Sequence, residues 1–110
     1  GRYEKANGYL ERAVLLSSDP MLYYVMAKNE QCLGEYRQAE KHLLHAIDIL
    51  PERIYPYYLL MNLYTEPSYF QPAKLKTAID SVLTKKPKVE SSAIKEMKEK
   101  ARSMLNNTSI

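Results

Sequence analysis

The chain has 110 residues, of which 45% are hydrophobic and 26% charged, a composition typical of a globular protein rather than a disordered one. Its only cysteine, Cys32, cannot form an internal disulfide, which excludes a disulfide-stapled secreted mini-domain. The net charge of +3 is too small to indicate nucleic-acid binding by itself, and no apolar run approaches the ~20 residues that span a bilayer. The length predicts a single domain covering residues 1–110.

Apolar residues recur at i, i+3, i+4 and i+7 between the prolines of the chain, and this spacing predicts helices. Asp19-Pro20 has the residues of an N-cap followed by proline at the first helical position, and Pro51 closes a later helix. Gly34 can supply the left-handed residue of a tight helix–helix turn. No segment alternates with the period of a strand, so we expect an all-α chain. The expected helices are 2–16, 20–33, 36–50, 55–65, 72–84 and 90–106.

The sequence is similar to itself after a shift of 33 or 34 residues, which indicates an internal helical repeat. A shift of 33 residues superposes Gly1 on Gly34, Tyr3 on Tyr36, Ala6 on Ala39, Leu10 on Leu43 and Ala13 on Ala46. A shift of 34 residues superposes Tyr23 on Tyr57, Tyr24 on Tyr58 and Met26 on Leu60. The matches fall on small, aromatic and helix-breaking residues, where helix packing constrains the side chain.

Residues 33–40, together with Leu43, Ala46 and Pro51, resemble the second half of a tetratricopeptide repeat (TPR). The resemblance implies a right-handed superhelix of antiparallel helix pairs with a C-terminal capping helix. It divides the chain into the second half of a truncated repeat (1–18), two repeats (20–53 and 54–87) and a cap helix (89–106). Glu30 departs from the family pattern, which usually has an aromatic residue there.

Residues 51–60 and 86–97 are similar to the C-terminal repeat segment of some bacterial O-antigen ligase/polymerase-like membrane proteins. This resemblance implies a parent protein of surface-polysaccharide assembly, with the present residues as a soluble domain tethered to the bacterial inner membrane, on its cytoplasmic or its periplasmic face. No membrane span is expected in the fragment itself. The truncated first repeat implies an exposed helix face, through which the fragment could self-associate.

TPR arrays bind partner segments along the concave surface formed by the first helix of each repeat. The resemblance therefore predicts a groove for a protein or peptide ligand, formed by Tyr24, Lys28, Gln31, Tyr55, Tyr58, Leu59 and Asn62. Tyrosine suits such a surface because it offers a large contact area and a hydroxyl group. The alternative is that some of these tyrosines only pack against neighbouring helices. The lysine and asparagine pattern of repeats that clamp a C-terminal carboxylate is incomplete here.

No pattern in the sequence indicates catalysis, and we expect a non-enzymatic protein without cofactor or metal. His42 and His45 lie three residues apart, but no third ligand completes a metal site, and we expect them along a solvent-facing or inter-repeat edge. Residues 85–110 contain seven Lys and Arg against three Glu, but no aromatic residue for base stacking, so nucleic acid is the least favoured partner. A structural spacer and a soluble TPR adaptor unrelated to polysaccharide remain as alternative functions.

Overall fold

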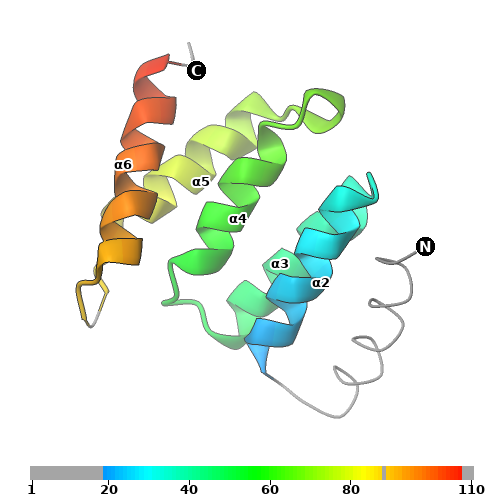
Figure 1. Cartoon of the computed structure of the whole chain (residues 1–110), viewed down its shortest axis with the longest axis horizontal. Helices are drawn as coiled ribbons and strands as arrows, with labels where there is room; N and C mark the ends of the chain where they lie inside the picture. The colour runs from blue at the N-terminus through cyan, green and yellow to red at the C-terminus, as the bar shows by residue number, and fades with distance from the viewer. Residues whose placement is uncertain (1–18, 88, 108–110) are drawn as a thin grey trace. The chain divides into compact units, whose positions relative to one another are not determined.

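The computed structural model describes residues 19–87 and 89–107, which form five α-helices and one short 3-10 helix (Figure 1). No strand occurs in these two ranges, so the expected all-α class is confirmed for them. The expected helix 2–16, and with it the truncated repeat 1–18, lies outside the described residues.

The helices end close to where the sequence predicts, each boundary differing by at most two residues. They are α2 (Pro20–Cys32), α3 (Tyr36–Ile49), α4 (Tyr55–Tyr64), α5 (Pro72–Thr84) and α6 (Ser92–Asn107). The sequence predicted only a break at Pro67, and the structure forms the 3-10 helix η1 (Pro67–Tyr69) there. Prolines set many of these boundaries because a proline ring fits the first turn of a helix but not its interior.

The described chain divides into two compact units at Pro51 and Glu52, and each is described by itself. Unit 1 is the hairpin of α2 and α3. Asp19 caps α2 as expected, its Oδ1 accepting a hydrogen bond of 3.0 Å from the amide of Met21. Gly34 takes the expected left-handed conformation, with φ of 78°, and the amide of Glu35 donates to the carbonyl of Glu30 at 2.8 Å. This Schellman-type turn reverses the chain between the helices.

The interior of unit 1 combines small and large side chains. Ala27 on α2 and both Ala39 and Ala46 on α3 are buried, and their small size allows the helices to approach closely. Met26 and Leu43 are also buried and fill the remaining volume. Small residues at the contact and large ones beside it therefore hold α2 and α3 together.

Unit 2 contains α4, α5 and α6, with α5 packed against both of its neighbours (Figure 1). Its interior is formed by aliphatic side chains of α4 and α5, among which Met61, Leu63, Leu75, Ile79 and Val82 are completely buried. Helix α6 is amphipathic and contributes one fully buried residue, Ala101. Helix α6 packs against α5.

Candidate functional site

The predicted groove residues belong to two helices, one in each unit. In unit 1 they form the α2 face, defined as Tyr24, Lys28 and Gln31. Tyr24 is buried, with 5% of its surface exposed, whereas Lys28 is exposed and Gln31 is half-buried. On the same helix Met21 and Val25 are exposed large apolar residues. The α2 face therefore offers a partner mainly Lys28 and Gln31, with Met21 and Val25 beside them.

In unit 2 the predicted residues form the α4 face, defined as Tyr55, Tyr58, Leu59 and Asn62. Their spacing places all four on one side of a helix with 3.6 residues per turn. The rings of Tyr55 and Tyr58 are nearly parallel, with an interplanar angle of 24° and centroids 6.4 Å apart. Both tyrosines are half-buried, and Leu59, on the same side of α4, is buried. The structure thus brings an ordered pair of aromatic rings to the surface of α4.

Asn62 carries a buried hydrogen-bond acceptor that no described group satisfies. Its side-chain oxygen Oδ1 is inaccessible to solvent, yet it has no hydrogen-bond partner in the structure. The backbone carbonyl of Asn62 does have a partner, accepting from Thr65 Oγ1 at 2.7 Å. An unsatisfied buried polar atom costs about 1–3 kcal/mol, and such atoms in native proteins call for an explanation.

Lys100 is a further residue beside the α4 face, which the sequence analysis did not identify. Its Nζ lies over the ring of Tyr58, 5.5 Å from the centroid, in a cation–π arrangement. Lys85 lies in the same way over Tyr57, at 4.9 Å. Residues 85–110 contain no aromatic residue, so the order of residues along the chain shows no ring beside these lysines. The packing of unit 2 instead supplies tyrosines from α4.

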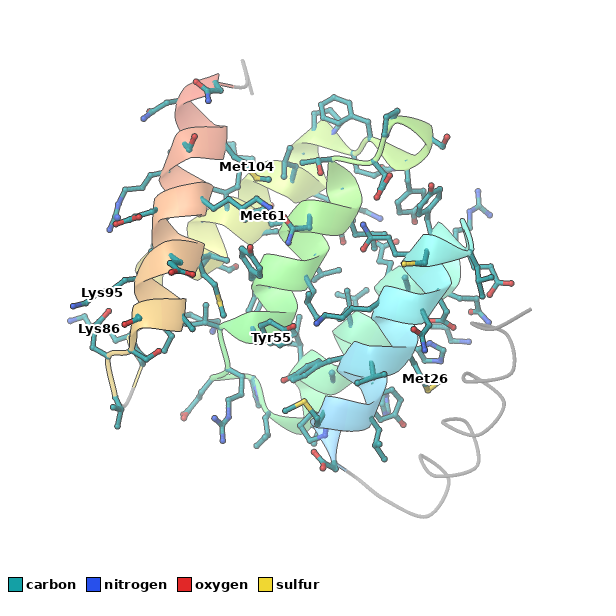
Figure 2. All side chains as sticks on the ribbon, in the orientation of Figure 1. Met26, Tyr55, Met61, Lys86, Lys95 and Met104 are labelled. Carbon is teal, nitrogen blue, oxygen red and sulfur yellow. The ribbon has the colours of Figure 1, made fainter. Side chains whose placement is uncertain are left out.

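Lys98 has a structural role at the junction of α5 and α6. Its Nζ donates to the backbone carbonyls of Leu83 at 3.3 Å and of Lys85 at 2.8 Å. These carbonyls lie at the C-terminus of α5, where the helix dipole favours a positive charge. Figure 2 shows Lys86 and Lys95, by contrast, on the outer side of this region, and both are exposed. Lys98 therefore holds α6 to the end of α5, whereas Lys86 and Lys95 are exposed to solvent.

The histidines of α3 do not both lie on a solvent-facing edge. His42 is half-buried, and its Nδ1 forms a hydrogen bond of 2.7 Å with Oε1 of Glu30, a buried residue on α2. His45 is exposed, and its ring lies 4.7 Å from that of Tyr23. The sequence showed Glu30 only as a departure from the repeat pattern. The structure shows that His42 pairs with it across the hairpin.

Within residues 19–87 and 89–107, no three metal-ligating side chains lie together. None of the helices described for this chain combines the length and apolar character needed to cross a bilayer. The α4 face carries aromatic rings and an amide, and the ammonium group of Lys100 on α6 lies beside it. Such groups can bind and orient a ligand. No model of a known protein family matches the chain, and no curated protein sequence matches it.

Proposed function

We propose that this protein is a non-catalytic protein–protein interaction module that binds a peptide or partner segment through the α4 face. The observation that carries the proposal is the α4 face, where the nearly parallel rings of Tyr55 and Tyr58 are half-buried and Asn62 lies one helical turn beyond Tyr58. Aromatic rings supply contact area with little loss of side-chain entropy.

The proposal includes a TPR-like right-handed superhelix as the architecture of the chain. Three features support it: the resemblance of residues 33–51, the α2–α3 hairpin with its left-handed turn at Gly34, and the burial of Ala27, Ala39 and Ala46. Repeats of this kind expose the first helix of each pair as a binding surface. Helices α2 and α4 are the first helices of the two proposed repeats.

The resemblance of residues 51–60 and 86–97 supports a more specific proposal, in which the module belongs to a membrane protein of O-antigen or other surface-polysaccharide assembly. There it would dock a partner of the assembly machinery. The coding sequence upstream of residue 1 tests this part. A multi-spanning membrane domain supports the polysaccharide parent, whereas further helical repeats alone would favour a soluble adaptor.

A binding experiment tests the central part of the proposal. Peptides selected from a random phage-displayed library on the purified protein would be synthesised, and their dissociation constants measured by isothermal titration calorimetry. We expect Tyr58→Leu and Asn62→Ser each to weaken binding about ten-fold, since each removes one well-placed contact. The control is Lys76→Ala, a change on the exposed side of α5. Selected peptides that bind both variants as tightly as they bind the unmodified protein would refute the proposal.

A structural spacer is the second candidate, and the burial of Tyr24 and Leu59 favours it, because both side chains already pack within the protein. A spacer needs the predicted groove residues for stability only. In that case Tyr58→Leu would lower the melting temperature while library selection returned no peptide that depends on Tyr58 or Asn62.

A further inference from the structure

We infer that α6 is a displaceable cover over part of the α4 face, so that the opening of this helix regulates binding there. This inference rests on the proposed function and adds its regulation. The contact that carries it joins Lys100 to Tyr58, whose ring centroid lies 5.5 Å from the lysine Nζ. Lys100 shields that face of the ring, and a partner that packs on it must displace Lys100 first.

The cover is the helix rather than one side chain. Met97, Lys100 and Met104 follow one another at intervals of three and four residues, so they share one side of α6. Both methionines are half-buried, and α6 contacts α4 as well as α5. Figure 2 shows Met104 on the side of α6 that faces the other helices of unit 2. The stripe that carries Lys100 is therefore packed, and Tyr58 is uncovered when α6 moves away.

Helix α6 buries less of itself than the two helices beside it. Ala101 is its one fully buried residue in a length of 16, whereas α5 buries four of 13 residues and α4 six of ten. The large apolar residues of α6 are only half-buried. An element with few buried apolar contacts opens at a lower free energy than the core of its unit. We therefore expect α6 to open while α4 and α5 stay folded.

Two residues of α6 allow its attachment to be weakened without a change in the α4 face. Lys98 donates hydrogen bonds to the backbone carbonyls of Leu83 and Lys85 at the end of α5. Ala101 is completely buried. Neither Lys98 nor Ala101 belongs to the α4 face, so replacing them leaves every proposed binding residue in place.

A cover makes a prediction that a purely structural helix does not make. When only an open fraction of the molecules binds, the measured dissociation constant is the intrinsic one divided by that fraction. Weakening the attachment of α6 raises the open fraction. The substitution then lowers the stability of the protein and strengthens its binding at the same time.

The first measurement is native-state hydrogen exchange of the free protein at low urea concentrations, followed by NMR. We expect the amide of Ala101 to have a protection factor about ten-fold or more below that of Leu63, a buried residue of α4. Its exchange should also depend less on urea, because opening one helix exposes less surface than global unfolding. Equal protection with equal urea dependence would show one cooperative unit and would overturn the inference.

The second measurement is the dissociation constant of the library peptides, by isothermal titration calorimetry. Ala101→Gly and Lys98→Met should each tighten binding about five-fold, which corresponds to an attachment weaker by about 1 kcal/mol. Ala101→Gly leaves the charge of the protein unchanged, so its effect is not electrostatic. Lys95→Met is the charge control at an exposed position of α6, and Ala27→Gly removes a buried methyl group from unit 1. Both controls should leave the affinity unchanged.

Three results would overturn the inference. The first is unchanged or weaker binding by Ala101→Gly and Lys98→Met. The second is equal tightening by Ala27→Gly, which would indicate a general loosening of the protein. The third is tightening by Lys100→Ser alone, which would show that one side chain shields the ring while the helix stays in place.

These results also separate the inference from the proposed function. If the selected peptides depend on Tyr58 but bind Ala101→Gly and the unmodified protein equally, the cover is refuted and the interaction module stands. If no selected peptide depends on Tyr58, the proposed function fails and the inference fails with it.

Discussion

Oε1 of Glu30 and Nδ1 of His42 lie 2.7 Å apart and form a hydrogen bond that joins α2 to α3. Glu30 is buried, with only 2% of its surface exposed, and a buried carboxyl group is tolerated when a polar partner satisfies it. The repeat family that the chain resembles usually has an aromatic residue at this position. The hydrogen bond gives the buried carboxyl group its partner and links the two helices of the hairpin.

The first prediction follows from this pair. His42→Ala leaves the Glu30 carboxyl group buried without its partner and should lower the free energy of unfolding by about 1–3 kcal/mol. The double variant Glu30→Leu/His42→Leu removes both polar groups and should lie within about 1 kcal/mol of the parent. Urea denaturation followed by circular dichroism measures both. A double variant less stable than His42→Ala would show that the pair does more than satisfy a buried group.

The second prediction concerns the turn of unit 1. Gly34→Ala should destabilise the protein by about 1–2 kcal/mol, because a side chain is disfavoured at a φ of 78°. A Cβ placed there meets no atom within 4 Å, so the cost is that of the backbone conformation alone. Gly34→Asn should cost less, since asparagine tolerates the left-handed region. Equal stability of the alanine and asparagine variants in the same denaturation assay would contradict this explanation.

The third prediction concerns the contact between α5 and α6. Lys98→Met retains most of the side-chain length but removes the donor to the carbonyls of Leu83 and Lys85, and it should cost about 1 kcal/mol. Lys95→Met, on an exposed position one turn earlier, should change stability by less than about 0.5 kcal/mol. Thermal unfolding compares the two. Similar melting temperatures for both variants would mean that the hydrogen bonds of Lys98 contribute nothing measurable to stability.

The fourth prediction links stability to binding at Asn62. Because Oδ1 is buried without a partner, Asn62→Leu should stabilise the free protein, by up to about 1 kcal/mol. The same change should abolish the contribution of this residue to peptide binding. A residue that serves function at the expense of stability behaves in this way. Loss of stability together with unchanged binding would assign Asn62 a purely structural role.

The limits of the helices could be predicted from the sequence because local residues determine them. Asp19 and Pro20 start α2, Gly34 turns the chain, and Pro51 follows the end of α3. These effects act over a few residues and need no knowledge of the tertiary structure. The 3-10 turn at Pro67 was missed because a single proline indicates a break without specifying its conformation.

The contacts of the candidate site could be predicted only in part. Helical spacing brings Tyr55, Tyr58 and Asn62 to one side of α4, and the sequence reveals that spacing. The position of Lys100 over Tyr58 depends on how α6 packs in unit 2, which spacing along one helix does not specify. The burial of Oδ1 of Asn62 likewise depends on its surroundings in the folded chain.

The most direct test of the central claim is an NMR titration of the ¹⁵N-labelled protein with the tightest-binding library peptide. The proposal predicts that the largest chemical-shift changes fall on the backbone amides of Tyr55 and Tyr58, the side-chain amide of Asn62 and the backbone around Lys100. Resonances on the exposed side of α5, such as Thr77, should remain unchanged. Saturable binding with shift changes that leave Tyr58 and Asn62 unaffected would contradict the claim that the α4 face is the binding surface.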